Sequence, residues 1–209
     1  MSRFIPDHES GPSSELPVSH RFGFAFIKPG YEAISPRFQA DLEENGIYTV
    51  HQTPFRLHRG AIDYIYRDST HEPFYPNMRR YLADHAILGM VLEGEEDVPT
   101  QDVLNSLKRG SDGYPSLRDR YHKPEDVVDD DDFNRWCKGE HDPERHDELT
   151  IKLTQGNVFH AADDPIDAMH TFRALKKYNP DFYDPNETTR THRLRRLIEY
   201  IEEIGYDKE

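Results

Sequence analysis

The sequence has little cysteine and no long hydrophobic run. Its single cysteine, Cys137, excludes an internal disulfide and a zinc site built from several cysteines. The longest strand-like apolar run covers residues 22–27, far fewer than the roughly 20 residues that span a bilayer. The N-terminus lacks the apolar core of a signal peptide and is too acidic for a transit peptide. We therefore expect a cytoplasmic protein without a membrane partner.

Basic side chains are also few relative to acidic ones. The 209 residues hold 26 Lys and Arg against 40 Asp and Glu, a formal net charge of −14. Non-specific binding to nucleic acid depends on phosphate neutralisation by Lys and Arg, so this composition argues against that class of partner. Neither the P-loop pattern nor the dinucleotide-binding glycine pattern occurs.

Hydrophobic periodicity and turn residues predict an α/β sandwich, in which helices pack against a mixed sheet. The strand at residues 22–27 ends at a Lys-Pro-Gly turn, and Gly46 ends the helix that precedes the next strand. The predicted strands cover residues 22–27, 47–57 and 86–92, and the predicted helices cover residues 35–45, 59–66, 74–84, 98–107 and 189–204, with a further helix starting at Asp164 and Pro165.

Residues 119–149 interrupt this pattern. They hold 12 acidic and 5 basic side chains, a net charge of −7 that is half the charge of the chain. Like charges repel, so we expect a solvated loop, followed by an alternating strand at residues 149–153. His141 and His146 lie in this segment, but a loop does not hold metal ligands rigidly, and no metal site is predicted there.

His160 lies between a predicted strand and the helix that starts at Asp164. Asp164 is a favourable N-cap and Pro165 a favourable first helical residue. The free amides and the dipole at a helix N-terminus favour an anion, so an imidazole facing a phosphate fits this position. On this stretch alone, however, an ordinary turn histidine is the favoured interpretation.

Five short motifs in order change that balance, because the segment from about residue 21 to residue 178 resembles the nucleoside diphosphate kinase family. The motifs are residues 26–30 (Phe-Ile-Lys-Pro-Gly), Tyr66 with residues 73–75 (Pro-Phe-Tyr), residues 90–94 (Met-Val-Leu-Glu-Gly), residues 116–118 (Ser-Leu-Arg) and residues 157–160 (Asn-Val-Phe-His). The resemblance implies an α+β fold with a ferredoxin-like antiparallel sheet covered by helices.

The resemblance also implies a division of the chain. Residues 20–178 would form the kinase-like domain, with residues 119–149 as an acidic insertion. Residues 1–19 would be a flexible tail and residues 179–209 a C-terminal helical extension. A homo-oligomer is expected, and the insertion or the C-terminal helix offers a surface for a protein partner.

By this resemblance, His160 would carry a phosphohistidine and pass the γ-phosphate of a nucleoside triphosphate to a nucleoside diphosphate. Lys28 and Arg118 would contact the phosphates, and Tyr66 would donate a hydrogen bond near the γ-phosphate. Mg²⁺ would come with the nucleotide phosphates, without protein metal ligands. Two further residues complete the implied nucleotide site: Asn157 on the ribose and β-phosphate side, and Phe74 stacked on the base.

Several positions depart from the family pattern. Ala161 and Ala162 replace a Gly-Ser pair, and Thr171 stands where an acid normally supports the second nitrogen of the histidine ring. Asp102 stands in place of a phosphate-binding arginine, which Lys108 or Arg109 would replace if the helix is longer. Three functions therefore stay open. They are an active divergent kinase, a weakened or inactive subunit that binds nucleotide or acts as a scaffold, and another histidine phosphotransferase or nucleotide hydrolase.

Overall fold

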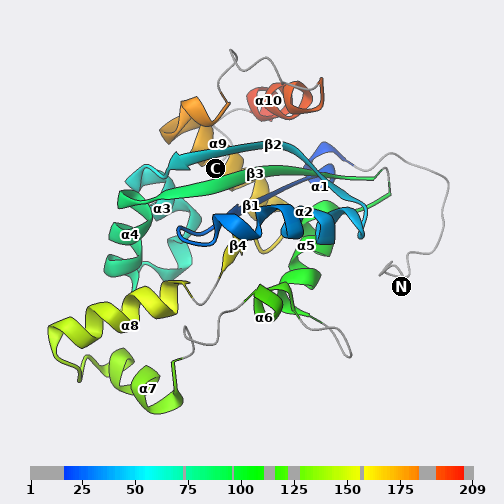
Figure 1. The fold of residues 1–209 in the computed structure, drawn as a ribbon. Coiled ribbons are helices and arrows are strands. Elements are labelled where there is room, and N and C mark those ends of the chain that lie inside the picture. Colours follow the sequence, from blue (N-terminus) through cyan, green and yellow to red (C-terminus); the bar gives the residue numbers. More distant parts are fainter. Residues whose placement is uncertain are drawn as a thin grey trace.

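The computed structural model describes residues 17–72, 74–95, 97–110, 116–121, 128–155, 158–183 and 192–204. These residues contain a four-stranded sheet in the order β2-β3-β1-β4, in which every strand pair is antiparallel (Figure 1). The strands are β1 (Phe22–Ile27), β2 (Ile47–Arg56), β3 (Ala86–Gly94) and β4 (Phe159–Ala161).

Helix α2 (Ser35–Glu43) follows β1, and α5 (Thr100–Arg109) follows β3. With the strands, these two helices make the β-α-β-β-α-β order of a ferredoxin-like fold. The predicted fold class, α+β with a ferredoxin-like antiparallel sheet covered by helices, is confirmed. The mixed sheet expected from periodicity alone is wrong, because β4 pairs with β1 in the antiparallel direction.

Strand β1 lies at the centre of the sheet, and all six of its residues are buried. Successive side chains point to opposite faces. Phe24 and Phe26 therefore enter one core cluster, and Ala25 and Ile27 enter the other. A strand buried on both faces reads as a continuous apolar run, which is why residues 22–27 were recognisable in the sequence.

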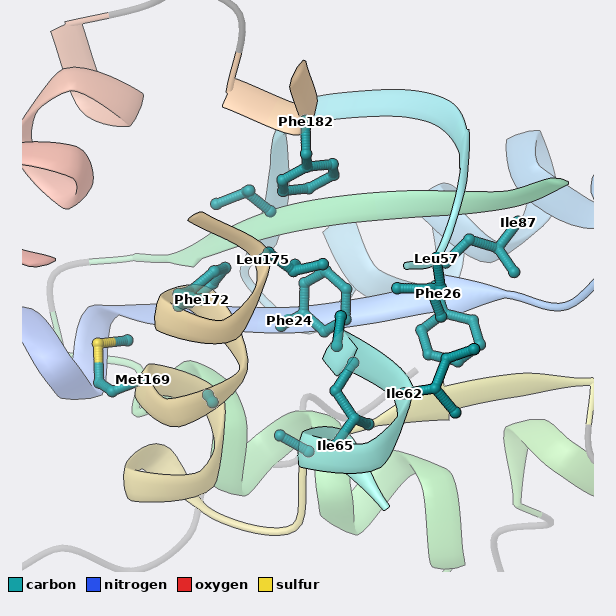
Figure 2. Close-up of a cluster of buried hydrophobic side chains, with 14 of the residues drawn as sticks. Phe24, Phe26, Leu57, Ile62, Ile65, Ile87, Met169, Phe172, Leu175 and Phe182 are labelled. Carbon is teal, nitrogen blue, oxygen red and sulfur yellow. The ribbon is translucent and has the colours of Figure 1, made fainter. Parts of the chain in front are cut away.

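The first face of the sheet is covered mainly by helices from outside the ferredoxin-like order. Figure 2 shows Phe24 and Phe26 of β1 among Ile62, Phe172 and other apolar side chains. The ring of Phe172 meets the ring of Phe24 edge to face, with centroids 5.8 Å apart. The helices on this face are α3 (Arg59–Ile65), α4 (Tyr75–Asp84), α9 (Pro165–Tyr178) and α10 (His192–Ile204).

The second face is covered by α2, α5 and the short helix α6 (Leu117–Tyr121). Phe38 of α2 packs on Phe159 of β4, with ring centroids 4.8 Å apart. Helix α6 contributes Leu117 and Tyr121 to the same cluster. Helix α6 is thereby fixed close to β4, which positions the candidate site.

The predicted loop at residues 119–149 is wrong, since this segment contributes to α6, α7 (Asp130–Lys138) and α8 (Pro143–Gln155). The Asp129 side chain caps α7 by accepting a hydrogen bond of 2.8 Å from the backbone amide of Asp132. Three further carboxylates lie in the first turn of α7, where the helix dipole favours negative charge. The predicted strand at residues 149–153 is also wrong, because these residues lie inside α8.

The termini hold the remaining elements. Residues 1–16 lie outside the described part, and helix α1 (Val18–Arg21) begins within the segment predicted as a tail. The predicted C-terminal helix is present as α10, while residues 189–191 of that prediction lie outside the described residues. Short 3₁₀ helices are η1 (Glu32–Ile34), η2 (Arg67–Ser69) and η4 (Pro180–Tyr183). Over the described ranges, no helix has the length and apolar character needed to cross a membrane.

Candidate functional site

His160 lies in β4, opposite Phe26 of β1, at the junction that precedes α9. Its imidazole stacks on the Phe26 ring with centroids 4.9 Å apart and an interplanar angle of 21°. The Tyr66 ring also contacts it, with centroids 5.0 Å apart and an interplanar angle of 54°. As predicted, Asp164 caps α9 by accepting a hydrogen bond of 2.8 Å from the amide of Asp167. The ring therefore contacts two aromatic side chains near a helix N-terminus.

Three cationic side chains lie close enough to His160 to lower its pKa. Lys28 follows β1 directly, and its amide donates a hydrogen bond of 3.0 Å to the carbonyl of Val158 beside β4. Lys108 is buried near the end of α5, and its Nζ donates to the carbonyl of Ala161 at 3.0 Å and to Asp163 at 2.7 Å. The Arg118 guanidinium of α6 lies 6.0 Å from the centroid of the Phe159 ring.

Burial and mutual repulsion change the ionisation of these groups. Burial lowers the pKa of His160 to about 3, with further lowering by Lys108, Lys28 and Arg118, so the imidazole is neutral at pH 7. Burial also lowers the pKa of Lys28 to about 7, and the charge of Arg118 adds to this effect. Burial lowers the pKa values of Lys108 and Arg118 as well. An anion bound among these cations would offset their repulsion.

Two buried nitrogen atoms of this site lack hydrogen-bond partners among the described residues: Nε2 of His160 and Nε of Arg118. A buried polar atom without a partner is rare in folded proteins and is often explained by a missing ligand or water. Thr171 is buried in α9, but no hydrogen bond joins its hydroxyl to His160 in the described structure.

The other predicted site residues lie in different surroundings. Tyr66 ends α3, and burial raises the pKa of its phenol, so the hydroxyl stays protonated and can donate. Phe74 precedes α4, and its ring stacks on Trp136 of α7, with centroids 6.1 Å apart. Asn157 lies outside the described residues.

Asp102 and Lys108 lie at opposite ends of the same helix, α5. Asp102 is exposed in the first turn of α5, and the helix runs to Arg109, two residues beyond its predicted end. Lys108 is therefore the α5 cation beside His160, one of the two replacements that the sequence suggested. Asp163, the carboxylate that pairs with Lys108, has no role predicted from the sequence, although its position three residues after His160 is a usable signal.

Among the residues that the structure describes, no group of three or more His, Cys, Asp and Glu side chains is arranged to hold a metal ion. A cavity of about 220 Å³ lies away from His160, between α4 and α8, and its lining includes Asn77, Arg80, Asp84 and Asp147.

Among the comparisons with known proteins, only the search of solved structures found similar chains. No family model matches the sequence. No curated protein matches it either. The chain is similar to a nucleoside diphosphate kinase of Aquifex aeolicus, with 13% identity and a TM-score of 0.49 over 74% of this chain and 94% of that one. A nucleoside diphosphate kinase of Encephalitozoon cuniculi has 16% identity and a TM-score of 0.47 over 87% and 99%. An NDP kinase of Pyrobaculum aerophilum has 14% identity and a TM-score of 0.45 over 74% and 94%. At such scores, no conclusion about activity depends on these likenesses.

Proposed function

We propose that this protein transfers the γ-phosphate of a nucleoside triphosphate to a nucleoside diphosphate through a phosphohistidine on His160. One observation carries the proposal: three cations with lowered pKa values surround a neutral imidazole that keeps partial exposure. A neutral imidazole is the nucleophilic form of histidine, and a cluster of cations is the electrostatic complement of a phosphate chain.

The phosphoryl transfer takes place in two half-reactions. Nε2 of His160 is buried, so we assign the attacking lone pair to Nδ1 and the ring proton to Nε2. Nδ1 forms a bond to the γ-phosphorus, the bond from that phosphorus to the bridging oxygen breaks, and the diphosphate leaves with the electron pair. A β-phosphate oxygen of the acceptor then attacks the phosphorus, and the electron pair of the broken N–P bond returns to Nδ1.

The surrounding side chains supply positioning and charge neutralisation, which are the main requirements of phosphoryl transfer. Lys28 and Arg118 bind oxygens of the transferred phosphoryl group and of the β-phosphate, and the protonated Tyr66 donates near the γ-phosphate. Lys108 stays bound to Asp163 and adds positive potential. Asn157 and Phe74 are assigned to the ribose and base sides. Mg²⁺ enters as the counter-ion of the substrate triphosphate.

The replacement His160→Gln tests this function with little loss of side-chain volume. With γ-labelled ATP, we expect the wild-type protein to form an acid-labile phosphoprotein that loses its label to unlabelled diphosphates. Labelling should vanish in His160→Gln, and phosphate exchange should fall by about a thousandfold or more.

His71→Ala is the matched control, because His71 is a histidine with 75% of its side chain exposed. It should label and exchange like the wild type. Labelling of His160→Gln at the wild-type level would refute the proposal, as would a wild-type protein that forms no phosphohistidine.

A further inference from the structure

The ring of Phe74 is covered by the indole of Trp136, the only tryptophan in the sequence. The two rings are nearly parallel, with an interplanar angle of 22° and centroids 6.1 Å apart. This distance lies in the range of aromatic pairs in direct contact. A nucleobase therefore cannot lie between the two rings while they keep this arrangement.

Trp136 is firmly placed within its own helical unit. It is 3% exposed, and its indole Nε1 donates a hydrogen bond of 2.8 Å to the hydroxyl of Thr150 in α8. The imidazole of His146, also in α8, stacks on it with centroids 5.6 Å apart. Helices α7 and α8 thus hold the indole as one unit, so displacing the indole means moving this unit or turning the side chain out of it.

The unit formed by α7 and α8 lies outside the two core clusters and contacts α4. None of their described residues belongs to either core cluster, and in Figure 1 the two helices lie beyond the edge of the sheet layer. Their polar contacts with α4 are an exposed ion pair of 3.5 Å between Arg80 and Asp147 and a hydrogen bond of 3.4 Å from Asn77 to Thr150. The cavity of about 220 Å³ lies in the same interface. Such polar contacts, one of them exposed, oppose the opening of the interface only weakly.

We propose that α7 and α8 form a cap in which Trp136 occupies the face of Phe74 that a nucleobase would stack on. This inference rests on the proposed function, which assigns Phe74 to the base. A nucleotide completes its contacts only after its base has displaced the indole from Phe74. A phosphate chain without a base reaches the cations around His160 with the cap closed. Trp136 is thus a specificity-determining residue that weakens the binding of nucleotides relative to the binding of base-free polyphosphates.

Trp136 fluorescence tests the displacement directly, because no other tryptophan contributes. Saturating ADP should shift the emission to longer wavelength as the indole leaves its buried position. Inorganic tripolyphosphate, with its binding followed by calorimetry, should leave the emission unchanged. An unchanged emission at calorimetrically saturating ADP would overturn the cap.

The replacement Trp136→Ala tests the competition. Loss of the aromatic pair should tighten ADP binding by about tenfold and leave the dissociation constant of tripolyphosphate unchanged. Trp136→Phe keeps an aromatic ring on Phe74 and should bind ADP like the wild type. Cys137→Ser, at an exposed neighbouring position in α7, is the second control.

The outcomes separate the cap from the proposed function. If Trp136→Ala binds ADP no more tightly than the wild type, or more weakly, the cap is refuted even where His160 is phosphorylated. If ADP binding tightens but no phosphohistidine forms, the cap stands and the transfer function fails. If neither protein binds ADP in calorimetry, both proposals are refuted.

Discussion

At the scale of single residues, Lys28 shows how burial prepares the candidate site for an anion. Burial and the charge of Arg118 lower its pKa to about 7, so the free protein carries this ammonium only in part at neutral pH. A phosphate bound beside it would favour the charged form and raise the pKa again. Binding of an anion is therefore linked to uptake of a proton by Lys28.

The linkage predicts how nucleotide affinity depends on pH. Between the pKa of the free protein, about 7, and the higher pKa of the complex, binding takes up a proton, so the association constant falls as pH rises. At pH 8, ADP titrations in two buffers of different ionisation enthalpy should report uptake of most of one proton. Lys28→Met should bind more weakly and take up none. An equal proton uptake by both proteins would show that another group titrates.

Short motifs identified the residues that lie close together in the fold, while their roles stay predictions. Lys28, Tyr66, Arg118 and His160 were all named from short motifs, and the fold brings them to one place. Trp136 was not named. Its contact with Phe74 joins residues 62 positions apart and depends on how α7 packs, which no local pattern records.

At the scale of elements, α7 and α8 show where periodicity and charge mislead. The four consecutive aspartates were interpreted as a solvated loop, but they cap α7 and form its first turn, where the exposed amides favour carboxylates. The five residues 149–153 alternate like a strand, yet a window this short also fits one turn and a half of helix. Ion pairs from Glu148 to Arg145 and Lys152, at helical spacing, favour the helix.

Deletion of residues 130–155 tests whether this pair of helices is an independent unit. The chain on both sides is anchored in the second core cluster, by Tyr121 and Val158, and residues 122–129 with 156–157 remain to join them. We expect the deletion variant to unfold cooperatively. Its free energy of unfolding should be lower by about 2 kcal/mol, because the face of Phe74 becomes exposed to water. This corresponds to a melting temperature lower by about 4–8 °C in calorimetry.

The same deletion removes Trp136, so ADP should bind as tightly as it does to Trp136→Ala. Cys137→Ser, at an exposed position in α7, serves as a control with no expected change in stability. A broad, non-cooperative transition of the deletion variant would mean that α7 and α8 form part of the folding core.

At the scale of the whole molecule, the sheet topology brings together site residues that lie far apart in the sequence. Lys28 follows the central strand, Lys108 lies in the helix after β3, and His160 lies in the edge strand β4. The order β2-β3-β1-β4 makes β1 and β4 neighbours although more than 130 residues separate them. Strand and helix order alone suggested a mixed sheet. The motif order predicted the antiparallel one, because it carries information about the whole fold. The expected homo-oligomer stays a prediction.

The charge of the whole molecule opposes the charge of its candidate site. The chain has a net charge of −14, while Lys28, Lys108 and Arg118 make a local cationic group. A nucleotide approaching from a distance meets repulsion, which salt screens over a Debye length of about 10 Å at 0.1 M. The cations are largely buried, so salt screens their contact with bound phosphate less.

Raising KCl from about 20 to about 300 mM should therefore increase the association rate constant of ADP by several-fold. The dissociation rate constant should change less. Stopped-flow records of Trp136 emission would give both constants, and uncharged adenosine should show no salt dependence of association. A rate constant for ADP that falls with salt would mean that the potential of the site, rather than the net charge, governs the encounter.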